Sequence, residues 1–165
     1  MIINAQYQLG LFYYRVHDII ESIINFTQTA NQNHIDSQYM LGAIFSHNQN
    51  LIKKSIYFLK KAADSNHPLA QYKLGMIYYE VEKDIMVAIR YLKLAASSNI
   101  ADVYYILSII YSNGKYIEKN KTIALICLTN TANLNHQEAK KKLDKINESL
   151  FNEDLGLLSL DFRYR

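Results

Sequence analysis

Apolar and small residues recur along this chain with a period that matches a pair of short helices. The marks are two Ala pairs and two weaker Thr-Ala pairs, Ala62-Ala63, Ala95-Ala96, Thr29-Ala30 and Thr131-Ala132. Their second members stand at 30, 63, 96 and 132, so successive copies are separated by 33, 33 and 36 residues. Self-similarity at a fixed period of about 20 to 50 residues is the signature of a repeat architecture.

Each copy carries the same ordered set of positions. A small or β-branched residue is followed by a tyrosine, as in Ser37 and Tyr39, Ala70 and Tyr72, and Val103 and Tyr105, and Tyr7 holds that place in the first copy. A Leu-Gly pair comes next at Leu9-Gly10, Leu41-Gly42 and Leu74-Gly75, with Leu107-Ser108 in the fourth copy. On a helix the small residue and the leucine share one face, and a glycine beside that face lets a second helix approach closely.

This pattern predicts two antiparallel helices in each copy. We expect first helices, called helix A, at 5–14, 37–47, 70–80 and 103–112, and second helices, called helix B, at 18–31, 52–65, 84–98 and 120–134. The array then covers 1–150, with repeats at about 5–36, 37–69, 70–102 and 103–138 and a closing helix at 139–150. An apolar tail at 151–165 is expected either to cap the last repeat or to dock a partner.

An asparagine follows the end of every predicted helix B. Asn33, Asn66, Asn99 and Asn135 each stand three residues after the small pair. After glycine, asparagine is the residue that best tolerates the left-handed conformation in which helices often end. His34, His67 and His136 come next, and Ile100 breaks this series. We expect these histidines to cover the preceding helix C-terminus, where positive charge is favourable.

Two segments of the chain resemble a known repeat family. They are AQYKLGMIY at 70–78 and AIRYLKLAA at 88–96, and both are similar to the Sel-one-like repeat (SLR), a relative of the tetratricopeptide repeat. The resemblance covers about 5–147, and it is closest in the second and third repeats and weakest in the first. The chain departs from the family in placing asparagine instead of glycine after helix B.

The resemblance implies a fold and a class of function. The fold would be an all-α, right-handed α-solenoid of antiparallel helix hairpins, whose concave face is lined by helix A. Proteins similar to this act as adaptors and scaffolds, and bacterial members occur in secretion, envelope and host-interaction systems, some as immunity partners of toxins. Catalysis is not usual in the family, so we expect no enzyme activity.

Composition narrows the class of partner. The 165 residues carry a net charge of +3, which is too mild to indicate nucleic acid as a partner. No apolar run reaches the roughly 18 residues of a membrane helix, and no signal peptide is apparent at Met1, so we expect a cytoplasmic protein without membrane insertion. Delivery by a specialised secretion system stays open.

The repeat pattern does not bring together residues that would suit catalysis or the binding of a cofactor. The five glycines lie far apart, which excludes a phosphate-binding loop, and the single Cys127 falls at a core position of helix B. The histidines stand a repeat apart, farther than a shared metal ion allows. We therefore expect no catalytic residue, no metal and no cofactor. Glu80, Glu82 and Asp84 read as a solvated turn, and Lys140-Lys141-Lys142 as a solvated face.

The remaining candidate is a second apolar face of helix A. We expect partner-binding residues there, namely Leu11, Tyr14, Tyr39, Tyr72, Met76, Tyr79, Tyr105 and Ile109. Tyrosine suits this role because it buries much area, has few rotamers and keeps a polar tip. The alternative for Tyr7, Tyr39, Tyr72 and Tyr105 is packing against the preceding repeat. A second alternative is assembly through the open ends, including self-association through the uncapped N-terminal helix.

Overall fold

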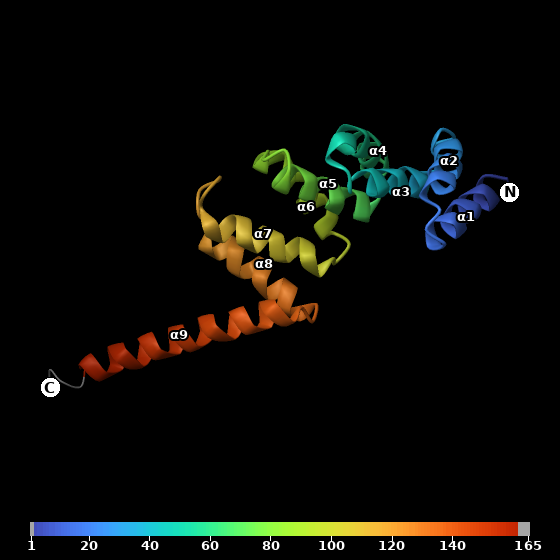
Figure 1. Cartoon of the computed structure of the whole chain (residues 1–165). Helices are drawn as coiled ribbons and strands as arrows, with labels where there is room; N and C mark the ends of the chain where they lie inside the picture. The colour runs from blue at the N-terminus through green and yellow to red at the C-terminus, as the bar shows by residue number, and fades with distance from the viewer. Residues whose placement is uncertain (1, 162–165) are drawn as a thin grey trace. The chain divides into compact units, whose positions relative to one another are not determined.

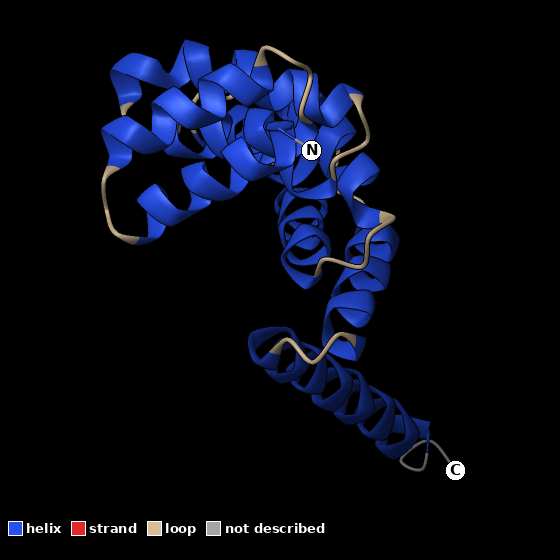
Figure 2. Cartoon of the chain, turned by 90° about the vertical axis from the view of Figure 1, so that its right-hand side faces the viewer, coloured by secondary structure: helices blue, strands red, loops and turns tan. Residues whose placement is uncertain are grey.

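The computed structural model describes residues 2–161 of the chain, and the side chains of 2–149. Helices account for its regular structure, and no strand occurs within 2–161 (Figure 2). The helices are α1 (Ile2–Arg15), α2 (Ile19–Ala30), α3 (Ile35–Phe45), α4 (Ile52–Asp64), α5 (Pro68–Glu80), α6 (Ile85–Ala96), α7 (Ala101–Asn113), α8 (Lys121–Asn133) and α9 (Gln137–Asp161), with a short 3-10 turn η1 (Gln49–Leu51) (Figure 1).

The chain divides into two compact units, which are described separately. Unit 1, Met1–Ser98, contains the hairpins α1/α2, α3/α4 and α5/α6, and unit 2, Asn99–Arg165, contains the hairpin α7/α8 and the helix α9. Every predicted helix is present, and the all-α repeat fold is confirmed. The one large difference is α9, which continues to Asp161 where we expected a closing helix to give way to a tail after 150.

Close packing inside each hairpin of unit 1 depends on the predicted glycines. A Cβ atom added at Gly42 would lie 2.5 Å from Leu59 Cγ, and one added at Gly75 would lie 2.8 Å from Leu92 Cγ. Gly10 holds the same relation to Phe26, at 2.8 Å. These distances are shorter than any ordinary carbon contact, so the helices of a hairpin meet where the side chain is missing.

Neighbouring hairpins of unit 1 stack through helix B of one repeat and helix A of the next. Ala70 and Leu74 of α5 form one buried cluster with Leu59, Ala62 and Ala63 of α4. A buried glutamine ties the same two helices together, because the Gln71 amide donates a hydrogen bond to the Ala63 carbonyl at 3.3 Å. Gln38 repeats this bond to Ala30 at 3.4 Å. Stacking therefore buries an apolar face and also provides hydrogen-bond donors for carbonyl groups at the end of helix B.

The asparagines adopt the predicted left-handed conformation. The φ angles of Asn33, Asn66, Asn99 and Asn135 are 61°, 61°, 54° and 64°. After α4, the Asn66 N–H bonds the Ala63 carbonyl and the His67 N–H bonds the Ala62 carbonyl, at 2.9 and 3.0 Å. This is the two-bond arrangement that closes a helix C-terminus.

The expectation for the histidines was wrong. The rings of His34, His67 and His136 turn forward and cap the following helix, because Nδ1 accepts the backbone N–H of Ser37, Ala70 and Ala139 at 3.2, 3.1 and 3.3 Å. An Nδ1 atom that accepts a hydrogen bond is unprotonated. The preceding helix is closed by the backbone of these residues and needs no charge from the ring.

Candidate functional site

A pocket of about 340 Å³ opens in unit 1 between α5 and the connection that leads from α3 into α4. Its lining combines apolar side chains with a few polar ones, and consists of Ser46, His47, Ile52, Tyr72, Lys73, Met76, Ile77, Glu80 and Val81. The volume falls at the lower end of the range for ligand pockets and is large enough for one or two amino-acid side chains. Helix α5 supplies five of the nine lining residues, of which Tyr72 and Met76 belong to its second apolar face.

The predicted binding residues are only partly brought together. Tyr72 and Met76 line the pocket, half-buried. Tyr79 is half-buried on α5 outside the pocket lining, and Tyr14 is exposed on α1. Leu11 packs against the buried cluster of Phe26, Ala30 and Leu41, so it supports the array more than it presents a surface. In unit 2, Ile109 is half-buried on α7.

Tyr39 and Tyr105 lie under histidine rings. Tyr39 stacks on His67 with 4.6 Å between ring centroids and 22° between planes, and Tyr105 stacks on His136 at 4.7 Å and 23°. Tyr7 makes the looser equivalent with His34, at 4.6 Å and 41°. Each tyrosine therefore packs toward the loop that starts the following repeat, whereas the alternative to partner binding placed it against the preceding repeat.

In two of the three stacked pairs, an aspartate lies beside the histidine. Asp36 Oδ1 lies 3.4 Å from His67 Nε2, and Asp102 Oδ1 lies 3.7 Å from His136 Nε2. With Nδ1 acting as acceptor in the cap, Nε2 carries the ring proton and points toward the carboxylate. One imidazole thus joins a helix cap, a tyrosine ring and a carboxylate within its own unit.

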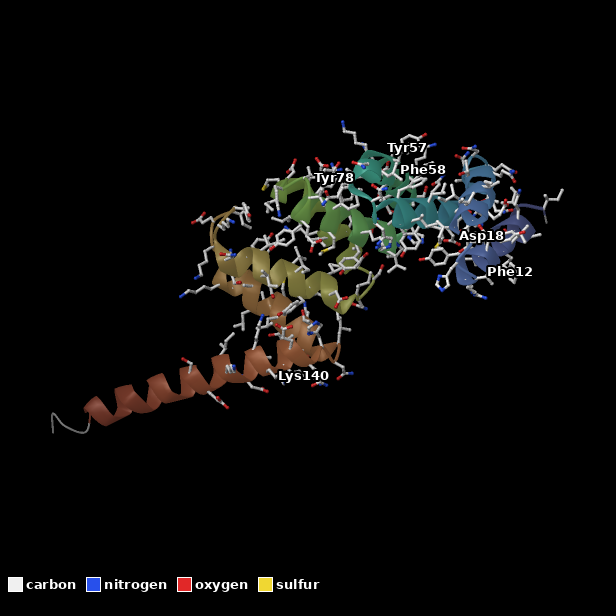
Figure 3. The ribbon with its side chains drawn as sticks, in the orientation of Figure 1. Phe12, Asp18, Tyr57, Phe58, Tyr78 and Lys140 are labelled. Atoms are coloured by element: carbon white, nitrogen blue, oxygen red, sulfur yellow. The ribbon has the colours of Figure 1, made fainter. Side chains whose placement is uncertain are left out.

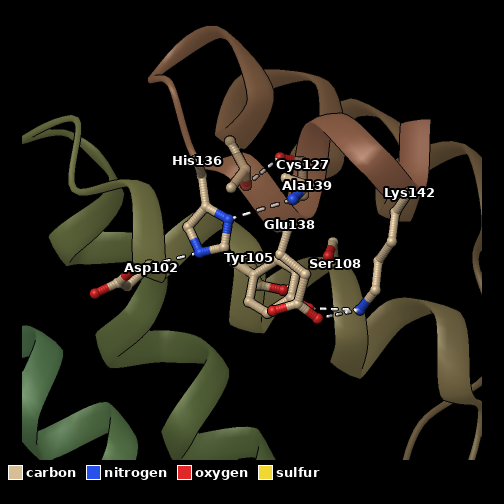
Figure 4. A network of polar contacts seen from close by, with 9 residues as sticks. Asp102, Tyr105, Ser108, Cys127, His136, Glu138, Ala139 and Lys142 are labelled. Carbon is tan, nitrogen blue, oxygen red and sulfur yellow. Dashed lines mark hydrogen bonds and ion pairs between the residues drawn. The ribbon is translucent and has the colours of Figure 1, made fainter. Parts of the chain in front are cut away.

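Unit 2 extends this arrangement into a surface network (Figure 4). The Tyr105 hydroxyl donates a hydrogen bond to Glu138 and accepts one from Lys142, while Lys142 Nζ lies 3.3 Å from Glu138 and 4.7 Å from the centre of the Tyr105 ring. The hydrogen bond from Tyr105, followed by that from Lys142, lowers the pKa of Glu138 below its ordinary value. Of the basic run, Lys142 is therefore engaged in local pairing, and Lys140 Nζ donates a hydrogen bond to Asn135 Oδ1 at 2.9 Å.

Burial sets the protonation of the stacked pair in unit 1. Desolvation lowers the pKa of His67 below its ordinary value, and the nearby Asp36 carboxylate opposes this shift without reversing it. Burial also raises the pKa of the Tyr39 phenol. Near pH 7 both side chains are therefore neutral, which suits the accepting role of His67 Nδ1.

The aspartate and histidine positions recur in the sequence, and their pairing could have been predicted from it. The pair is missing once, since Leu69 stands where Asp36 and Asp102 occur and Ile100, one repeat later, stands where His67 and His136 occur. Ile100 accordingly begins α7 without a side-chain cap.

Across the part of the chain that the structure describes, no three His, Cys, Asp or Glu side chains gather closely enough to hold a metal ion. Within the same residues, no helix has both the length and the apolar character needed to cross a bilayer.

The stacked hairpins, the small-residue contacts and the helix-A pocket define a helical repeat protein of the tetratricopeptide-like class. A family model described as plant tetratrico peptide repeats matches residues 45–148, and the Sel1 repeat model matches residues 3–34. The chain belongs to this family of tetratricopeptide-like repeats, and its first repeat matches the Sel1 type. The Sel1 match falls on the first repeat, which we expected to resemble the family least.

Solved structures show the same fold. A protective antigen of uropathogenic Escherichia coli with an SLR fold gives a TM-score of 0.78 at 22% identity, covering 86% of this chain and 32% of that protein. A Sel1 repeat protein from Oxalobacter formigenes gives 0.73 at 27% identity, covering 87% and 63%. MamA gives 0.68 at 20% identity, covering 94% and 86%. The chain thus spans less than two thirds of the first two proteins. No curated protein sequence matches it.

Proposed function

We propose that this protein is a non-catalytic interaction module that binds a partner protein or peptide on the helix-A face. The observation that carries the proposal is the pocket between α5 and the α3–α4 connection, where Tyr72 and Met76 belong to one lining. The family supports it, because repeat folds of this kind are typical of protein-interaction scaffolds. Tyr14 and Tyr79 in unit 1 and Ile109 in unit 2 are proposed as further contacts.

The pocket suits one apolar anchor side chain of a partner. Met76, Ile77 and Ile52 provide apolar lining, and a methionine adapts its shape to different side chains because it is unbranched and flexible. Lys73 and Glu80 bring one charge of each sign to the same lining, which favours a partner segment with polar residues around its anchor. No cofactor, metal or nucleic acid takes part in this proposal.

Tyr39 and Tyr105 have a smaller share in the proposed surface. Their rings are stacked under His67 and His136, so a partner would reach only the remaining edge of each. Leu11 belongs to the first buried cluster. We therefore place the energetic centre of the surface on α5.

The test compares capture of partners by three forms of the full chain. Mass spectrometry of proteins retained from the native host identifies a partner, and its affinity is then measured for the parent, Met76→Lys and Met86→Lys. Met86 is a matched control, because it is a methionine of the same unit that is 68% exposed on α6. We expect Met76→Lys to weaken binding at least about tenfold, with Met86→Lys unchanged. Equal affinity for all three forms would place the partner elsewhere.

A second candidate function is assembly, in which the ends of the array dock into a larger complex. The exposed apolar side chains of α1 favour it. The side chains of the proposed docking tail at 151–165 lie outside the described residues, so its role as a cap or docking segment stays a prediction.

A further inference from the structure

The outer side of α4 carries a group of exposed lysines around a tyrosine. The group, here called the α4 basic face, consists of Lys53, Lys54, Tyr57, Lys60 and Lys61. Its four lysines are the only Asp, Glu, Lys or Arg residues between Asp36 and Asp64. Tyr57 is 54% exposed, and Figure 3 shows it on the outer side of α4. The face therefore combines concentrated positive charge with one aromatic ring.

The helix period places these five side chains on one side of α4. At about 100° per residue they fall within an arc of about 120°, with Tyr57 near its middle. One pair of lysines stands at 53–54 and the other at 60–61. With a rise of about 1.5 Å per residue, the two pairs are about 10 Å apart along the helix. The face therefore presents positive charge at two points with the ring of Tyr57 between them.

Carboxylates of the described structure do not neutralise this charge. Among the described side chains, no lysine of α4 forms an ion pair with a carboxylate. Lys61 Nζ instead lies 4.8 Å from the centre of the Tyr57 ring. A surface helix is usually stabilised by acidic residues three or four positions from its lysines, and Lys53 and Lys54 have no acidic residue at that spacing. The charge of the face is therefore available to a partner.

The lysines belong to the second repeat and are not part of the repeat pattern. The equivalent positions of the other helices B are Ile20, Glu21, Thr27 and Gln28 in α2, Met86, Val87, Lys93 and Leu94 in α6, and Thr122, Ile123, Thr129 and Asn130 in α8. Each of these helices has at most one lysine there, and all of them form. The fold itself therefore does not require positive charge on the outer side of helix B.

From these observations we infer that the α4 basic face docks an acidic segment of a partner protein, in which carboxylates flank one apolar residue. Lysine ammonium groups donate hydrogen bonds and accept none, and carboxylates are acceptors of opposite charge. The apolar residue of the partner packs on Tyr57, because a tyrosine buries much area and has few rotamers. In a helical partner, carboxylates seven residues apart match the spacing of the two lysine pairs. No residue of the face lines the pocket beside α5, so the two surfaces are independent.

Nucleic acid and lipid fit the same face less well. A base stacks on an open aromatic ring, whereas one side of the Tyr57 ring faces Lys61 and the ring also meets Phe58 edge-on, with 5.0 Å between centroids and 78° between planes. A helix that binds a bilayer inserts several apolar side chains, and Tyr57 is the only exposed aromatic or apolar side chain of α4. A protein segment needs only one such anchor.

Fluorescence anisotropy with the full chain tests the inference. The probe is a labelled helical peptide with two pairs of glutamates seven residues apart around one leucine, and its control peptide has glutamines in place of the glutamates. We expect the glutamate peptide to bind, more weakly as salt is raised, and the glutamine peptide not to bind. Lys53→Glu combined with Lys60→Glu should weaken binding at least about tenfold. Lys121→Glu combined with Lys141→Glu reverses two exposed lysines of unit 2 and should change little.

Three outcomes of this measurement would overturn the inference: no binding of the glutamate peptide, equal binding of the glutamine peptide, or equal effects of the two double variants. Vesicles that contain phosphatidylserine and a single-stranded DNA are tested against the same variants. If either bound more tightly than the peptide and through Lys53 and Lys60, the partner class would be wrong. Met76→Lys should leave peptide binding unchanged, which separates this face from the pocket beside α5.

The role of Tyr57 is tested without changing the charge. Tyr57→Ser should weaken binding of the peptide that carries leucine more than binding of a peptide with glutamine at that position. A third peptide, with its glutamate pairs four residues apart, should bind more weakly than the first. Equal losses for the two central residues would rule out Tyr57 as the anchor, and equal affinity for the two spacings would rule out recognition by the two lysine pairs.

Discussion

The imidazole of His67 lies against the ring of Tyr39, with 4.6 Å between the centroids, and its Nδ1 accepts the N–H of Ala70 at 3.1 Å. The tyrosine belongs to helix A of one repeat, and the capped helix belongs to the next. His67 therefore links the second and third repeats of unit 1 through packing on one side of the ring and a hydrogen bond on its edge.

Removing this ring should lower stability in two separable steps. His67→Ala loses the cap, which is typically worth about 0.5–2 kcal/mol, and the ring contact, worth about 0.5–1.5 kcal/mol. His67→Asn keeps a good capping side chain and loses only the ring contact. We expect urea unfolding to rank the free energies of unfolding as parent, then His67→Asn, then His67→Ala. His47→Ala, at an exposed histidine, should stay close to the parent.

The free energy of unfolding should also decrease as the pH falls, because His67 is titrated. The pKa of His67 is lowered on folding, chiefly by burial, so the unfolded chain takes up a proton at a higher pH than the folded one. The contribution is complete above about pH 6.5, the ordinary histidine pKa, and is lost as the pH falls through the lower pKa of the folded protein. Unfolding by urea between pH 8 and 5 measures it. The difference between parent and His67→Asn should shrink toward pH 5, and a constant difference would contradict the assignment.

The glycine contacts predict overpacking. In Gly42→Ala the new methyl group would stand 2.5 Å from Leu59 Cγ and 3.0 Å from Leu59 N, so side chain and backbone must both move. We expect a loss of about 1–3 kcal/mol in the free energy of unfolding. Gly75→Val should cost at least as much in its own hairpin. Lys54→Ala, at an exposed position of α4, is the control and should change little.

The left-handed conformation of Asn66 predicts that glycine is tolerated at this position better than alanine. Asn66 has a φ of 61°, and Asn66→Ala keeps the Cβ atom in this conformation but removes the short polar side chain that makes it tolerable, so the change should cost about 1 kcal/mol. Asn66→Gly should be neutral or slightly stabilising, because glycine adopts this conformation without strain. Thermal unfolding of both variants decides the matter. A helix C-terminus that tolerated alanine better than glycine would argue against the role given to Asn66.

The sequence alone determined the features of this protein that repeat locally. Small residues every 33 to 36 positions, the Leu-Gly pairs and the asparagine after each helix B indicated the helices, their close contacts and their left-handed ends. These follow from the helix period and from the conformations that glycine and asparagine allow, which depend on near neighbours in the chain. The all-α repeat fold followed directly from them.

Only the tertiary structure decided which apolar faces of the helices A are covered, and by which residues. Tyr39 and Tyr72 occupy equivalent positions in sequence, yet His67 lies over Tyr39 and Tyr72 lines an open pocket. The direction of the His67 ring depends on the turn at Asn66 and on the free N–H groups of the helix that follows, neither of which the residue type reveals. Leu9 of α1 and Leu74 of α5 hold equivalent positions in the sequence, yet Leu9 is 44% exposed and Leu74 is fully buried.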